Sequence, residues 1–251
     1  TVHSVLYFKT TFYYDGCREV TIRGEHFRAL IELCFSHADL FSLHRCSWQG
    51  AQDGALEQAL RPYLVGEYLS FGTLCWFDKE YQEKCYLYQA TQETKELLLQ
   101  HIHHLFDTEK SLAPAGHEAF LRKKYAVYDR AGQEASSCFQ AYLDAVDRDT
   151  AEDQGEAVWK EVAQNARKRC PDVFAESDYY SHMEDLCFFR NREAFFVTIT
   201  HEQDCWVQIL SPEFQRTLGK LGKWVASNET PLPLLSLDSL DGFKWYGAAH
   251  A

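Results

Sequence analysis

Apolar and polar residues alternate in three parts of the chain, and helical spacing follows each of them. The first part alternates over residues 6–14, reaches Asp15-Gly16 and continues over residues 17–22. Asp-Gly between two β-rich runs is typical of a tight hairpin, because these residues accept a positive φ. Apolar residues then recur at helical spacing, namely Phe27, Leu30, Ile31 and Cys34. The pattern predicts a hairpin followed by an amphipathic helix.

The second part repeats this order with a different turn. Strands are expected over residues 68–77 and 84–88, with a polar turn at residues 78–80 between them. Thr91 has a side chain that favours the N-cap position of a helix. The residues behind it form one apolar stripe, consisting of Leu98, Ile102 and Leu105. We expect a second hairpin and a second helix.

The third part has two β-rich runs around a turn, and one further strand. The runs are residues 186–189 and 195–200, the turn is residues 190–192, and the further strand is residues 205–210. Ser211 followed by Pro212 indicates a helix start, because Ser caps the first amides and Pro fits the first helical position. The expected apolar face of this helix contains Phe214, Leu218, Leu221 and Val225. The second and third hairpins align without a gap, which suggests two related lobes.

These patterns predict an α+β fold with two related lobes of antiparallel hairpins, each followed by a helix, and a central helical segment. The boundaries divide the chain into an N-terminal lobe over residues 1–106, a helical connection over residues 107–170 and a C-terminal lobe over residues 171–251. A single domain is the alternative. Prolines exclude a regular helix early in the tail that begins at Ser227. Its later apolar residues predict an extended segment that packs across the body.

Composition and charge narrow the classes of partner. The chain has 251 residues and a formal net charge of −12 at pH 7. Nucleic acids and anionic membranes are also negatively charged, so we expect neither as a partner. No apolar run is long enough for a membrane helix, and the first residues show no signal-peptide pattern. Nine cysteines without a Cys-x-x-Cys pair favour free thiols and a cytoplasmic protein.

Two candidate sites involve histidine or cysteine, although no phosphate-loop, dinucleotide, zinc-ribbon or nucleophile-elbow motif occurs. His101 and His104, with His103 between them, are spaced to bind one metal ion from a helix. Solvated histidines at a helix C-terminus, where they interact favourably with the helix dipole, explain the pattern equally well. Cys170 follows the basic residues 167–169, which favours a thiolate. Ordinary helix termination is the alternative.

Two further candidates involve charged residues. Glu184 and Asp185 precede the third hairpin, and His201 lies in the polar loop over residues 201–204, so these groups could act as acid and base. A polar hairpin loop is the alternative. Basic residues could bind an anion or pair with the abundant carboxylates. They are Arg122, Lys123, Lys124, Arg167, Lys168, Arg169, Arg190 and Arg192.

The negative charge, the aromatic fraction of 15% and the missing catalytic motif favour a stoichiometric protein-binding protein. We expect an immunity or antitoxin type of protein that masks a basic partner. The candidate binding residues are carboxylates in two clusters: Asp147, Asp149, Glu152, Asp153, Glu156, Glu80 and Glu83. We expect no cofactor and no metal, and the sequence leaves enzymatic activity open while favouring a binding protein. The alternatives are an enzyme with a non-local His, Cys and carboxylate site, or a small-molecule sensor.

Overall fold

The computed structural model describes seven parts of the chain. They are residues 5–9, 11–13, 18–46, 53–69, 84–112, 179–227 and 236–246. The chain divides into two compact units. The first contains Thr1–Phe12, Glu19–Lys110 and Ser181–Ala251, and the second contains Tyr13–Arg18 and Ser111–Tyr180. Nearly all of the second unit lies outside the described residues, so the fold and the site below concern the first.

One nine-stranded sheet organises the first unit, and all its neighbouring strands are antiparallel. In spatial order its strands are β12 (Val225–Ala226), β1 (Val5–Lys9), β11 (Asp204–Gln208), β10 (Glu193–Ile199), β9 (Met183–Arg190), β4 (Leu40–Arg45), β6 (Lys84–Gln89), β5 (Leu64–Leu69) and β13 (Lys244–Trp245). Two small sheets pair β2 (Thr11–Tyr13) with β3 (Arg18–Val20), and β7 (Lys110–Leu112) with β8 (Tyr179–Ser181).

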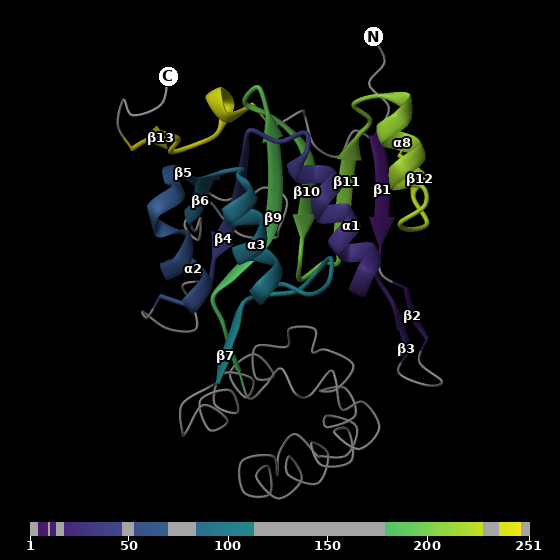
Figure 1. Ribbon diagram of the computed structural model, residues 1–251, viewed down its shortest axis with the longest axis horizontal. Coiled ribbons are helices and arrows are strands. Elements are labelled where there is room, and N and C mark those ends of the chain that lie inside the picture. The colour runs from purple at the N-terminus through teal and green to yellow at the C-terminus, as the bar shows by residue number, and fades with distance from the viewer. Residues whose placement is uncertain are drawn as a thin grey trace, which may run out of the picture. The chain divides into compact units, whose positions relative to one another are not determined.

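Four α-helices are described, and they pack against one face of the large sheet (Figure 1). They are α1 (Gly24–Phe35), α2 (Ala55–Leu60), α3 (Gln92–His101) and α8 (Pro212–Leu218). Two 3-10 helices are also described: η2 (Arg61–Tyr63) follows α2, and η5 (Leu237–Ser239) lies in the tail before β13. None of the helices described is long and apolar enough to cross a membrane. The structure is therefore an α+β fold dominated by antiparallel sheet.

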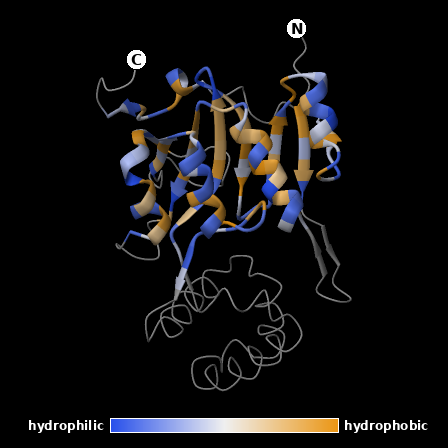
Figure 2. Cartoon of the chain, in the orientation of Figure 1, coloured by the Kyte–Doolittle hydropathy of each residue, from blue (hydrophilic) through white to orange (hydrophobic). Residues whose placement is uncertain are grey.

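Two core clusters cover the two faces of the sheet. The first cluster lies beneath the helices and contains all four apolar residues that were predicted to line the first helix: Phe27, Leu30, Ile31 and Cys34. Figure 2 shows these helices with mixed apolar and polar residues and the central strands as mainly apolar. The second cluster includes Tyr68, Cys187 and Leu237, so the tail contributes to the opposite face. Both faces of the sheet thus bury apolar side chains, as its near-continuous apolar strands require.

Both predicted helix caps are confirmed. The Thr91 side chain accepts a hydrogen bond from the amide of Thr94, and the Ser211 side chain accepts one from the amide of Phe214. These oxygens satisfy amides that have no partner inside the helix. The two helices begin where the sequence predicted because their start signals are local.

Two helix ends were predicted wrongly. Helix α3 ends at His101, so Ile102 and Leu105 are buried in the core but lie beyond the helix. Helix α8 ends at Leu218, and Val225 belongs to the edge strand β12, where it is 62% exposed. In both places the chain turns back to pair with other segments. Strand β12 pairs with β1, which helical spacing alone cannot indicate.

The first hairpin and the tail also differ in detail from the prediction. The run over residues 6–14 contains two strands, of which β1 pairs with β11 and β12 while β2 pairs with β3. The described part of the tail, residues 236–246, contains a 3-10 helix and then β13, which pairs with β5. Strands from residues 1–106 and 171–251 share the large sheet. The division into related lobes stays a prediction, because residues 74–77 and 113–178 lie outside the described parts.

Candidate metal centre

Five side chains that can bind a metal ion or transfer a proton converge where β4, β9 and β10 lie side by side. They are His44, Cys46, Glu184, Asp185 and His201, and we call them the donor cluster. The cluster consists of two groups of three that share Glu184. Within each group, the donor atoms all lie within 4.8 Å of one another. The first group adds His44 and Cys46 to Glu184, and the second adds Asp185 and His201.

Strand β4 places the first two members of the cluster. Leu43 belongs to the core cluster beneath the helices. Because side chains alternate along a strand, the neighbouring His44 points to the opposite face of the sheet. Cys46 follows the last residue of β4, and its amide donates a hydrogen bond of 2.7 Å to the carbonyl of His182. This bond holds Cys46 beside the start of β9.

A β-bulge on β9 brings two consecutive carboxylates to His44. The register pairs Ser42 with Cys187 and His44 with Glu184, so β9 has one more residue than β4 in this interval. The inserted position is Asp185, whose φ is 53°. Asp enters this left-handed region more readily than most residues, and bulges redirect side chains in this way. Without the bulge, Glu184 and Asp185 would point to opposite faces.

Thr200 holds the bulge in place. The Asp185 amide donates to Thr200 Oγ1 at 3.0 Å, and the Thr200 amide donates to Asp185 Oδ1 at 2.6 Å. His201 is the next residue, in the turn between β10 and β11, and its side chain is 41% exposed. The same pair of hydrogen bonds therefore stabilises the strained Asp185 backbone and places His201 at the solvent-facing side of the cluster.

The distances around His44 suit a shared cation better than direct hydrogen bonds. His44 Nδ1 lies 3.5 Å from Glu184 Oε1 and 3.7 Å from Asp185 Oδ2, at or beyond the limit of a hydrogen bond. Two ligand atoms at tetrahedral positions, each about 2.1 Å from Zn²⁺, lie about 3.4 Å apart. Burial, together with the Glu184 carboxylate, raises the pKa of Asp185 to about 6, while His44 and the Thr200 amide act in the opposite direction.

The donor types indicate a zinc-class ion. Cys46 forms no disulfide and is only 3% exposed. A set of imidazole, thiolate and carboxylate is typical of Zn²⁺ and its neighbours, whereas Mg²⁺ and Ca²⁺ prefer oxygen ligands throughout. His44, Cys46 and Glu184 together supply three protein ligands. A tetrahedral ion held by three residues keeps one position for water or another ligand.

The sequence indicated only part of this cluster. It singled out Glu184, Asp185 and His201 as a candidate acid–base group, and the structure does bring these three residues together. It missed His44 and Cys46, because β4 itself was not identified. Their spacing of two residues was the available signal, since a His and a Cys two apart on a strand share one face.

The histidine candidate at the end of α3 is wrong in its geometry. Helix α3 ends at His101, so His101 and His104 are not neighbours on a helix. His104 instead forms an isolated bridge with Arg23, and its Nε2 lies 3.4 Å from the Asp107 carboxylate. Neither histidine belongs to a potential metal-binding group within the described parts of the chain.

The basic candidate at the third turn has a structural role. Arg192 forms an ion pair with Asp238 of the tail. Its guanidinium also lies 5.3 Å from the ring centroids of both Phe243 and Trp245. Cation–π contacts of this kind hold the tail against the turn that follows β9. Arg192 thus follows the ion-pair alternative rather than the anion-site interpretation.

Apart from Arg190, an exposed residue at the end of β9, the remaining candidates lie outside the described residues. These are Cys170, the basic residues 122–124 and 167–169, and all seven carboxylates of the expected protein-binding surface. Those seven are Asp147, Asp149, Glu152, Asp153, Glu156, Glu80 and Glu83. Their roles stay predictions.

A scan against models of protein families finds no match to this chain, and neither do searches of curated proteins and of solved structures. The donor cluster is therefore the feature of the molecule from which a function can be inferred.

Proposed function

We propose that this protein is a zinc-class metalloprotein whose functional centre is the donor cluster. The observation that carries the proposal is the convergence of His44, Cys46 and Glu184, with donor atoms within 4.8 Å of one another. The imidazole and the thiolate come from β4 and the residue that follows it, and the carboxylate comes from β9, which is distant in the sequence. A small closure of the side chains brings them to the separations of a tetrahedral site. This replaces the sequence-based expectation of no metal.

The three-ligand set supports a catalytic centre rather than a structural one. Structural zinc sites are closed by four protein ligands, whereas catalytic sites keep one position open. Asp185 and His201 lie beside Glu184 and can exchange protons with a group bound at that position. An enzyme with a non-local His, Cys and carboxylate site was the alternative function considered from sequence. The reaction class that we propose for this open metal centre is metal-assisted hydrolysis.

Metal titration tests the proposal directly. Protein stripped with a chelator is titrated with Zn²⁺ by calorimetry, and we expect one ion per chain with a Kd on the order of 1 µM or tighter. Co²⁺ serves as a spectroscopic substitute, because a thiolate ligand adds a charge-transfer band in the near ultraviolet. Mg²⁺ at the same concentration should not bind, since two of the three donors are not oxygen.

Matched cysteine variants test whether a loss of Zn²⁺ binding is specific to the site or a general effect of removing a buried thiol. Cys46→Ala should weaken Zn²⁺ binding at least about 100-fold and remove the charge-transfer band, because loss of a ligand exceeds the usual 10–100-fold cost of losing an outer-shell partner. Cys205→Ala changes another buried free thiol, on β11, and should leave both readouts unchanged. Equal Zn²⁺ affinity in the two variants would contradict the proposal.

The open position has its own test. Azide added to the Co²⁺-loaded protein should change the visible spectrum, because a small anion can enter a free coordination position. An unchanged spectrum would indicate that Asp185 or His201 completes the coordination. The centre would then be structural, and the enzymatic part of the proposal would fail.

A protein-binding function remains a second proposal, supported by the net charge of −12. In this proposal a cytoplasmic protein of immunity or antitoxin type masks a basic partner through the carboxylates at residues 147–156 and at Glu80 and Glu83. Charge reversal of residues 147–156 should slow association with a partner isolated by affinity purification, most at low salt. Salt-independent association would exclude this mechanism.

A further inference from the structure

A second site lies on the helix-bearing face of the sheet. It is an open cavity of about 370 Å³ beside α2 and η2, and we call it the charged cavity. Arg45 of β4 lines it, whereas the adjacent His44 belongs to the donor cluster. Neighbouring residues of one strand point to opposite faces, so the charged cavity is separate from the metal centre.

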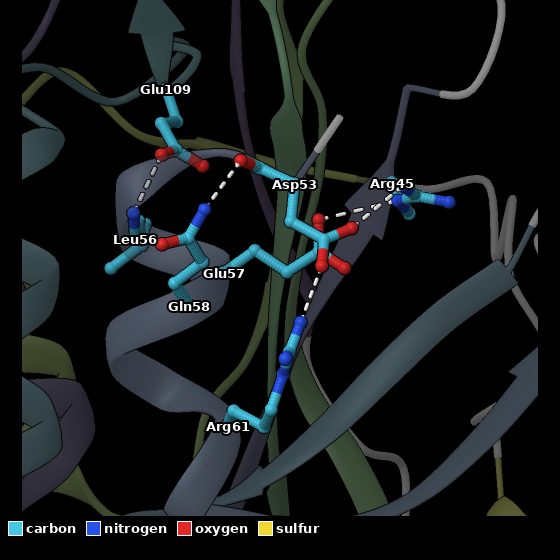
Figure 3. A network of polar contacts seen from close by, with 7 residues as sticks. All are labelled: Arg45, Asp53, Leu56, Glu57, Gln58, Arg61 and Glu109. Carbon is cyan, nitrogen blue, oxygen red and sulfur yellow. Dashed lines mark hydrogen bonds and ion pairs between the residues drawn. The ribbon is translucent and has the colours of Figure 1, made fainter. Parts of the chain in front are cut away.

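The lining of the charged cavity is electrically balanced. It contains three cations and three carboxylates: Arg45, Arg61, Lys84, Asp53, Glu57 and Glu67. These residues form two groups of opposite charges. On the α2 side, Arg45 lies 2.9 Å from Asp53 and 3.2 Å from Glu57, and Arg61 also pairs with Asp53 (Figure 3). Across the strands, Lys84 lies 3.0 Å from Glu67.

The carboxylates are fixed while two of the cations can move. The side chains of Glu57 and Glu67 are only 11% and 8% exposed. Those of Arg61 and Lys84 are 62% and 52% exposed, so they can turn toward a bound molecule. A ligand with a single strong charge would meet like charges on one side of the lining. A zwitterion can pair its positive end with a buried carboxylate and its negative end with a mobile cation.

Three tyrosines supply the apolar part of the cavity. Tyr86 and Tyr88 come from β6, and Tyr246 comes from the tail. The Tyr246 hydroxyl donates a hydrogen bond to the Glu67 carboxylate, and Tyr246 is 44% exposed. Aromatic faces beside paired charges favour a planar apolar group with a polar end. The cavity volume is near the lower end of the usual range for ligand sites, about 300–1,000 Å³, which suits one amino acid better than a nucleotide.

We propose that the charged cavity binds a free aromatic α-amino acid. Its ammonium lies against Glu57 or Glu67, its carboxylate is held by Arg61 or Lys84, and its ring packs among the tyrosines. This site is independent of the proposed zinc centre. It corresponds to the small-molecule sensor considered among the alternatives from sequence, with the chemical class of ligand now stated.

Calorimetry with L-phenylalanine and two analogues tests the assignment. We expect L-phenylalanine to bind the full chain with a Kd on the order of 100 µM. 3-Phenylpropanoate lacks the ammonium and phenethylamine lacks the carboxylate, so each should bind at least about tenfold more weakly, because a charge-assisted hydrogen bond is lost. Glycine lacks the ring and should also bind at least about tenfold more weakly. Absence of L-phenylalanine binding, or equal binding of any of these three probes, would overturn the assignment.

A pair of lysine variants locates the site. Lys84→Gln removes one cation of the lining, and its exposed side chain makes the substitution compatible with the fold. It should weaken L-phenylalanine binding about tenfold. Lys223→Gln changes an exposed lysine close to β12, at the edge of the sheet opposite β5 and β13, and should leave the affinity unchanged. Cys46→Ala should also bind L-phenylalanine normally, and a loss there would show that the two sites are one. Equal effects of the two lysine variants would refute the location.

Discussion

Glu109 makes the folding stability of this protein depend on pH. It precedes β7 and is only 2% exposed. Its amide donates a hydrogen bond to the Met183 carbonyl of β9, and its carbonyl accepts one from the amide of His182, the residue before β9. Its Oε1 accepts a 2.6 Å hydrogen bond from the Leu56 amide at the start of α2 (Figure 3). Its Oε2 is buried without a hydrogen-bond partner among the described residues. The substitution that tests its contribution is Glu109→Gln.

The direction of the effect follows from the carboxyl pKa. Burial raises the pKa of Glu109 from 4.5 to about 7, while the Leu56 amide opposes the shift and the nearby Glu57 adds to it. The folded state therefore retains a proton that the unfolded state has already released. The contribution of Glu109 to the free energy of unfolding is therefore largest below pH 4.5, falls as the pH rises to about 7, and is nearly absent beyond. The full shift corresponds to about 3.4 kcal/mol, of which about 2.5 kcal/mol falls between pH 5 and pH 8.

Urea unfolding of the wild type and Glu109→Gln at pH 5, 6, 7 and 8 measures this contribution. The glutamine retains an oxygen that accepts from the Leu56 amide and has no charge to desolvate. We expect the variant to gain about 2.5 kcal/mol relative to the wild type between pH 5 and pH 8. Other groups, Asp185 among them, contribute equally to both curves and cancel in the difference. Parallel curves would refute the assignment to Glu109.

Three further predictions concern packing, the bulge and the thiols. A Cβ at Gly54 would lie 2.3–2.5 Å from the Glu109 carboxylate, so Gly54→Ala should cost about 1–3 kcal/mol in urea unfolding, and much less in a Glu109→Ala background. Thr200→Val removes the oxygen that accepts from the Asp185 amide and should cost about 1–3 kcal/mol in thermal unfolding; an unchanged midpoint would mean that water replaces the hydroxyl. Alkylation of the denatured, unreduced protein should label all nine cysteines by mass spectrometry, whereas two or more disulfides would contradict the expected compartment.

Local signals explain which elements the sequence predicted well. The caps at Thr91 and Ser211 depend on residues within one helical turn, and the apolar stripe of α1 depends on spacing alone. Helix ends and strand partners depend on tertiary pairing. Val225 continues the helical spacing, yet it lies in an edge strand that pairs with β1. Because β1 is more than 200 residues earlier in the chain, local spacing could not indicate this pairing.

The same distinction applies to the donor cluster. Glu184, Asp185 and His201 appeared as charged residues close to one hairpin, and they were identified for that reason. The φ of 53° at Asp185 and the bulge around it depend on Thr200, fifteen residues later. His44 joins the cluster only through the register between β4 and β9. No short motif records such a pairing, so the convergence of the donor cluster could not be predicted from the sequence.

A buried apolar residue of the tail and an exposed one outside it form a matched pair that tests whether the tail acts as a structural strap. Leu237 is fully buried in the second core cluster, and its amide donates a 2.9 Å hydrogen bond to the Arg192 carbonyl. Leu237→Ala should cost about 2–5 kcal/mol, because it leaves a cavity against the sheet. Val225 lies in the opposite edge strand and is 62% exposed, so Val225→Ala should change stability by no more than about 0.5 kcal/mol. Urea unfolding of both variants decides the matter, and similar small costs would mean that the tail contributes no burial energy to the fold.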